Sequence, residues 1–203
     1  MCELLRADAE SLGGEAQIVE GDQFPIVYCR FDAGADRTLI VHTMYDTTPA
    51  EEAGWVVDPF AAARIPWKGL GECIVARGAQ DTKGPLALIH NVIAHYRDAG
   101  VPLPVNVILV QEASELASGS MAGFVAAHQE TLRQADVVWW PMFSQRPDGT
   151  PVVHLGAKGN MMGKFRCRGG DWGGPVEADL PGLHANWVAS PVMRLVQALA
   201  SMK

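Results

Sequence analysis

Hydrophobic and polar residues follow one another along this chain in patterns typical of an α/β protein. Runs rich in β-branched and other apolar residues predict strands at 26–31, 38–41, 72–75, 105–110 and 136–140. Apolar residues at helical spacing predict helices at 2–12, 85–96, 120–133 and 191–202. Strands and helices alternate between residues 72 and 140. This alternation favours a layered α/β domain with a largely parallel sheet.

Four segments lie outside this regular alternation. Residues 47–71 predict a long loop, and loops of this length with little structure of their own are usually functional. Residues 152–155 and 161–167 predict two further strands. The Gly/Pro-rich residues 169–189 predict a linker or a mobile flap.

Composition narrows the class of protein. The 203 residues are 48% hydrophobic and 19% charged, which is enough apolar material for a folded core and excludes global disorder. The formal net charge of −7 argues against nucleic acid and against an anionic membrane surface as partners. The apolar runs are too short for a membrane helix.

The four cysteines are scattered and form no CxxC pair. A disulfide framework is unnecessary at this size, so a reducing, cytoplasmic setting fits the chain. Cys29 and Cys167 fall within predicted strands, where we expect them to be small buried hydrophobic residues.

Carboxylates follow three of the predicted strands. Asp46 comes after the strand at 38–41, Asp81 after the strand at 72–75, and Glu112 and Glu115 after the strand at 105–110. Open α/β sheets bind ligands at the carboxyl ends of their strands. Carboxylates that converge there can hold a metal or act as general acid and base, although each one alone is as readily a solvated loop residue.

Among the sequences that follow a predicted strand, the segment 76–84 gives the most specific indication of function. Arg77, Asp81 and Lys83 are bracketed by Gly78 and Gly84, just before a predicted helix. The free N–H groups and positive dipole end of a helix N-terminus can orient a carboxylate or bind an anion. The segment lacks the spacing of a Walker phosphate-binding loop.

Taken together, these motifs resemble the co-catalytic zinc peptidase family of aminoacylases, carnosinase-type dipeptidases and acetylornithine deacetylases. The matching segments occur in family order at 39–49, 58–60, 76–84, 112–120, 156–159 and 183–195. The resemblance implies a three-layer α/β catalytic domain with two zinc ions and a smaller α/β lid domain that often dimerises. It also implies hydrolysis of an amide in a small acylated amino acid or dipeptide.

Carrying the family's metal ligands onto this chain exposes a conflict. The bridging aspartate falls on Asp81 and the general-base glutamate on Glu115. The metal-binding histidine falls on Met44, a metal-binding glutamate on Leu116 and a metal-binding aspartate on Met142. Zinc takes about four N, O or S ligands, and a thioether is a poor substitute for imidazole or carboxylate. We therefore expect that most ligands of the family's dizinc site are lost in this chain.

Two ways of retaining a metal stay open at this point. His42 lies four residues before Asp46, and a bulged loop would let it act as a ligand. A different register would make Glu112 and Glu115 the acidic pair. His184 resembles the lid histidine that contacts substrate in the family.

These arguments lead to one set of expectations. We expect a partial catalytic α/β domain at 1–150 and the beginning of a lid domain at 151–203. The missing half would come from a second copy, a complementary chain or residues outside this sequence. The expected catalytic residues are Glu115 and Asp46. The expected substrate-binding residues are His184, Lys83 and Arg77, and the expected metal ligand is Asp81.

Three functions remain open. The first is an enzyme that acts on a small amide or amino-acid-like substrate without a cofactor. The second is a non-catalytic binding or scaffold subunit. The third is a zinc hydrolase with rearranged ligands, if the family chemistry survives.

Overall fold

The computed structural model describes residues 1–67, 69–113, 120–156, 158, 159, 161 and 163–202. The chain divides into two compact units, Met1–Leu155 and Gly156–Lys203. No helix among the described residues is long and apolar enough to cross a membrane. The expected sites at Glu115 and Leu116 lie outside the described residues.

The first unit is built on a five-stranded sheet with the order β1-β2-β6-β3-β7. Its strands are β1 (Glu15–Val19), β2 (Ile26–Phe31), β3 (Thr38–Met44), β6 (Asn106–Glu112) and β7 (Val137–Trp139). β3 runs parallel to both β6 and β7. In the parallel β3–β6 register, Met44 lies opposite Glu112, so these two strands end at the same edge of the sheet.

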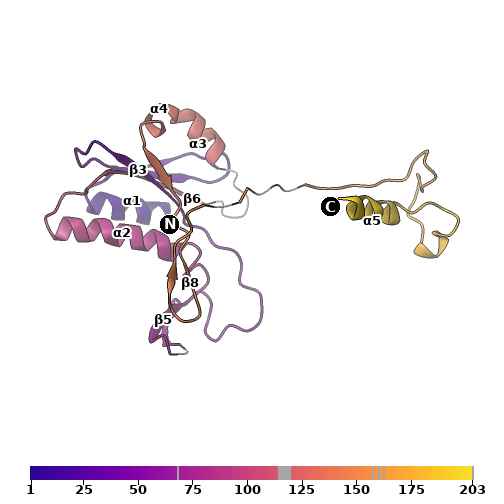
Figure 1. The fold of residues 1–203 in the computed structure, drawn as a ribbon, viewed down its shortest axis with the longest axis horizontal. Helices are drawn as coiled ribbons and strands as arrows, with labels where there is room; N and C mark the ends of the chain where they lie inside the picture. Colours follow the sequence, from indigo (N-terminus) through magenta and orange to yellow (C-terminus); the bar gives the residue numbers. More distant parts are fainter. Residues whose placement is uncertain (68, 114–119, 157, 160, 162, 203) are drawn as a thin grey trace. The chain divides into compact units, whose positions relative to one another are not determined.

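Helices cover both faces of this sheet and give it three layers (Figure 1). On one face, α1 (Cys2–Ser11) and α2 (Lys83–Asp98) pack Ala9, Ile89 and Ile93 against buried strand residues. On the other face, α3 (Met121–Ala127) and α4 (Gln129–Leu132) pack around Phe124. The predicted α/β fold class is therefore confirmed.

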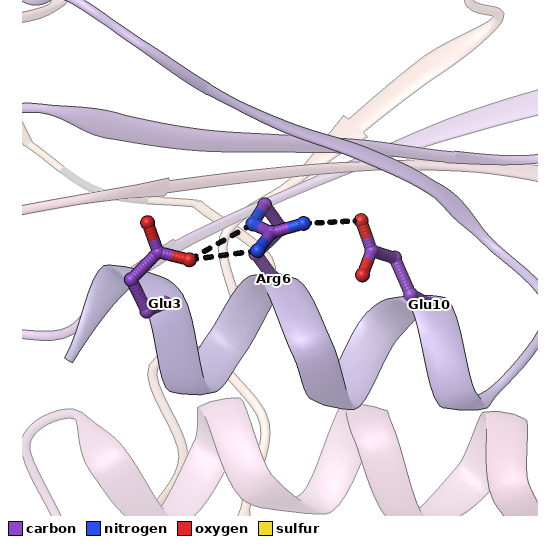
Figure 2. Close-up of polar contacts among 3 residues, drawn as sticks. All are labelled: Glu3, Arg6 and Glu10. Atoms are coloured by element: carbon purple, nitrogen blue, oxygen red, sulfur yellow. Dashed lines mark hydrogen bonds and ion pairs between the residues drawn. The ribbon is translucent and has the colours of Figure 1, made fainter.

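The outer side of α1 carries charges at helical spacing. Arg6 contacts Glu3 at 2.8 Å and Glu10 at 2.7 Å, as Figure 2 shows. These exposed pairs add only a few tenths of a kcal/mol each, about 0.2–0.5. The inner side of the helix buries Leu5 and Ala9, so burial of this apolar side fixes the helix on the sheet.

The expected largely parallel sheet is wrong in two respects. β1 was not predicted, and both β1–β2 and β2–β6 are antiparallel. The connection between β1 and β2 is too short for the helical crossover that a parallel pair requires. In addition, β5 (Glu72–Val75) pairs with β4 (Ala63–Pro66) in a separate two-stranded sheet. β5 has no buried residue, so it lacks the apolar face of a central strand.

Other boundaries also differ from the sequence prediction. The helix expected at 120–133 is two helices that meet at His128. Strands β8 (Ser144–Gln145) and β9 (Pro151–Val152) form a hairpin that keeps residues 151–152 with the first unit. The described residues of the strand expected at 161–167 form no strand.

The second unit contains a short 3-10 helix at Gly182–His184 and α5 (Pro191–Ser201). The Ser190 hydroxyl accepts a hydrogen bond from the Met193 N–H and caps α5. The Arg194 guanidinium lies 4.4 Å from the centre of the Trp172 ring. This cation–π contact ties α5 to residues 169–189, which are part of the second unit instead of a bare linker.

All four cysteines are free thiols. Cys29 is fully buried in β2, and burial raises the pKa of its thiol to about 12. This confirms Cys29 as a small hydrophobic core residue. Cys167 is half-buried and lies outside any strand, so the corresponding expectation for Cys167 is wrong.

Candidate functional site

Three loops meet at the edge where β3, β6 and β7 end. The Thr82 hydroxyl, just before α2, donates to the carbonyl of Met44 at 2.7 Å. The Gln80 side-chain amide donates to the carbonyl of Phe143 at 3.1 Å. Because Asp81 lies between Gln80 and Thr82, these two bonds hold it between the segments that carry Met44 and Met142.

Asp81 carries a buried carboxylate oxygen at this edge. Its Oδ1 is buried and has no hydrogen-bond partner in the part of the chain that the structure describes. A buried polar atom without a partner costs about 1–3 kcal/mol, so such atoms commonly await a ligand. The predicted role of Asp81 as a metal ligand stays a prediction.

The side chain of Lys83 contacts the backbone of Asp46, an expected catalytic residue. Its Nζ donates to the carbonyl of Asp46 at 2.9 Å. Burial lowers the pKa of Lys83, and the negative charge of Asp46 partly opposes this shift. Thus Lys83 and Asp46 occupy the same corner, and Oδ1 of Asp46 is itself buried.

A close approach of backbone to side chains makes glycine necessary at position 78. Gly78 has a φ of +83°, and a Cβ there would lie 3.3 Å from Thr47 Oγ1 and 3.6 Å from Lys83 Nζ. The left-handed backbone strains any other residue at this position. Gly78 therefore lets the segment 76–84 close against the loop that follows β3.

Arg77, expected to bind substrate, is engaged by the long loop that precedes it. Its backbone N–H donates to the carbonyl of Pro59 at 2.7 Å, and its guanidinium pairs with Glu52. The same guanidinium lies 5.2 Å from the centre of the Trp55 ring. The structure thus places Arg77 as an anchor for the loop.

His184 belongs to the second unit. Its ring stacks on that of Trp187, with centroids 5.5 Å apart. Its proposed contact with substrate stays a prediction. Glu115, the expected general base, is among the residues outside the description.

His42 and Glu112 form a pair that sequence reasoning considered only separately. His42 Nε2 lies 2.8 Å from Glu112 Oε1, and the Glu112 side chain is 4% exposed. The other carboxylate oxygen, Oε2, is buried and has no hydrogen-bond partner in the described part of the chain. Same-face alternation on two adjacent parallel strands is the signal that would have paired them.

The described donors near Asp81 do not by themselves fit a pair of zinc ions. Met44 is buried and Met142 half-buried, and both offer a thioether where the family has imidazole or carboxylate. Among the described residues, no group of three or more His, Cys, Asp or Glu side chains is close enough to hold a metal ion. One carboxylate does not supply the ligands that two zinc ions require.

Comparison with known proteins identifies the family of this chain. The sequence profile described as peptidase family M20/M25/M40 matches residues 41–201. The Cys-Gly metallodipeptidase DUG1 of Saccharomyces cerevisiae is 33% identical over 184 residues, which cover 88% of this chain and 36% of that protein. The human Beta-Ala-His dipeptidase is 30% identical over 175 residues, covering 78% of this chain and 32% of that protein.

Solved structures agree with this fold. The M20 family metallo-carboxypeptidase Sso-CP2 from Sulfolobus solfataricus gives a TM-score of 0.63 at 29% identity, over 73% of this chain and 33% of that one. The Saccharomyces cerevisiae dipeptidase Dug1p gives a TM-score of 0.63 at 22% identity, over 98% of this chain and 43% of that one. The chain spans about a third of the length of the curated relatives it matches. The profile match, the dipeptidase relatives and the shared α/β fold show that the chain belongs to peptidase family M20/M25/M40.

Proposed function

We propose that this chain carries the cleft of a hydrolase that acts on small amides, either dipeptides or N-acylated amino acids, without a pair of zinc ions. The observation that carries the proposal is the buried Oδ1 of Asp81, which has no hydrogen-bond partner among the described residues, together with the methionines Met44 and Met142 at two family ligand positions. The family's fold and its bridging carboxylate are retained, while the described donor set does not suit two metals.

In this proposal carboxylates supply the acid–base chemistry. One carboxylate of the pair Asp81 and Glu115 accepts a proton from water as the water oxygen bonds to the amide carbon. The other, protonated, gives its proton to the nitrogen as the carbon–nitrogen bond breaks.

The test is to measure metal content and turnover on the same preparation. We expect less than one zinc per chain, and hydrolysis of β-alanyl-histidine, cysteinyl-glycine or an N-acetyl amino acid that a chelator leaves unchanged. Glu115→Gln is expected to lose turnover while unfolding at the same urea concentration as the parent chain.

Three outcomes would contradict the proposal, each in a different way. Two bound zinc ions with chelator-sensitive turnover would indicate a zinc hydrolase with rearranged ligands. Binding of these compounds without any turnover would indicate a non-catalytic binding subunit. Turnover that Glu115→Gln leaves intact would remove the assigned acid–base pair.

We further propose that the chain works together with a second copy or a complementary chain. Val137 and Val138 on the edge strand β7 are 57% and 66% exposed, and Val192 on α5 is 69% exposed. Folded proteins usually cover such strand edges and apolar surface. Light scattering is expected to give a mass well above the 21.8 kDa of one chain, and a stable monomer of that mass would contradict the proposal.

A further inference from the structure

A hollow of about 350 Å³ lies against the sheet, between β3, β6 and β7 and the helices α3 and α4. Most of its lining is apolar, including Ile40, Val110, Phe124 and Val138. Its volume is in the range of small-molecule sites, which are typically apolar with a few polar groups that orient the ligand. None of the residues assigned above to the cleft around Asp81 lines it apart from His42.

A cationic side chain stands at one end of this lining. Arg133 follows α4 and is exposed, and it forms no ion pair within the described part of the chain. Gln129 lies four residues earlier in α4, on the same side of the helix, and also lines the hollow. A guanidinium and a side-chain amide offer several N–H donors, which is the arrangement that binds a carboxylate.

The opposite polar group in the lining comes from β3. The His42 ring is held by Glu112, whose carboxylate is buried beside it. Because Nε2 of His42 is engaged by Glu112, Arg133 is the cationic side chain of the lining that remains for a carboxylate. In a ligand with one carboxylate, we therefore expect the carboxylate to lie at Arg133 and the apolar body to lie along the sheet.

We propose that this hollow binds a small carboxylic acid with an aliphatic or aromatic body. The apolar body lies against Ile40, Val110 and Phe124, and the carboxylate pairs with Arg133. The charge complementarity of the unpaired guanidinium, in a chain with a net charge of −7, favours this ligand over a neutral polypeptide segment. Binding at this site does not depend on the activity proposed for the cleft.

The test uses phenylbutyrate and its uncharged counterpart phenylbutyramide, titrated calorimetrically into the 203-residue chain. Phenylbutyrate is expected to bind about tenfold or more tightly than the amide, because only the acid forms a charge-assisted pair with Arg133. Arg133→Gln should remove this difference and leave binding of the amide unchanged.

Matched variants separate this site from the cleft and from general charge effects. Arg146→Gln removes the same charge from an exposed arginine outside the hollow, and is expected to leave both titrations unchanged. Asp81→Asn should likewise leave both unchanged, even if it abolishes turnover in the cleft. Val125→Phe should fill the hollow from α3 and weaken both ligands.

Several results would overturn the proposal. They are the absence of binding, equal affinity for acid and amide, or equal effects of Arg133→Gln and Arg146→Gln. A dimer that Val125→Phe dissociates would show that a second copy occupies the hollow instead. Because Arg133 is exposed, its variant keeps the test decisive even if Val125→Phe does not fold.

Discussion

Replacing Met44 with histidine and Met142 with aspartate is expected to raise the zinc affinity of the chain roughly 10³-fold. With Asp81 these residues would supply three N and O donors, the number that a catalytic zinc site takes from protein. The hydrogen bonds from Thr82 to Met44 and from Gln80 to Phe143 already hold the three positions at one edge of the sheet. The variant therefore replaces two thioethers with an imidazole and a carboxylate at positions that the backbone already holds together.

Competition with a chromophoric zinc chelator measures this gain directly. The matched control is Met44→Leu with Met142→Leu, which removes both thioethers without adding a donor and should bind zinc no better than the parent chain. Adding Asp81→Asn to the histidine–aspartate variant should return its affinity to the parent value. If the parent chain already binds zinc as tightly as the variant, the interpretation of Met44 and Met142 as lost ligand positions is wrong.

Phe124→Ala is expected to lower the free energy of unfolding by about 3 kcal/mol. Phe124 is 2% exposed and packs in the cluster with Tyr28, Ile108 and Val110. Its ring also stacks on that of His128, with centroids 4.4 Å apart. Truncation removes these contacts and leaves a void on the side of the sheet that the short helices α3 and α4 cover.

Urea denaturation followed by tryptophan fluorescence provides the measurement. Val125→Ala is the control, because Val125 is the next residue of α3 and is 41% exposed. Its substitution should change the free energy of unfolding by less than about 1 kcal/mol. Equal losses for the two variants would show that burial of Phe124 does not hold α3 on the sheet.

The sequence predicted the core elements because their signals are local. The apolar residues 107–110 are all buried in β6, and the helical spacing of Ile89 and Ile93 places both in the core beneath α2. The motif around Asp81 and Lys83 identified the family from residue types and order alone. It also placed Met44 and Met142 at family ligand positions, since residue identity is written in the sequence.

Strand partners could not be read in this way. The segment 72–75 has the composition of a sheet strand, yet β5 pairs only with β4. When an apolar run is short, its local sequence pattern does not distinguish a central strand from a peripheral one. The same limit hid β1, whose residues Glu15 and Gln17 make it look polar.

The sequence by itself therefore determined the family, the α/β class and the chemical identity of the residues near Asp81. Only the tertiary structure decided which of them meet. It paired His42 with Glu112 across adjacent strands, assigned Arg77 to the loop through Glu52 and Trp55, and joined Thr82 to Met44. These contacts link residues distant in the chain, and their positions follow from the order of the strands in the sheet, which the local sequence of a single strand does not encode.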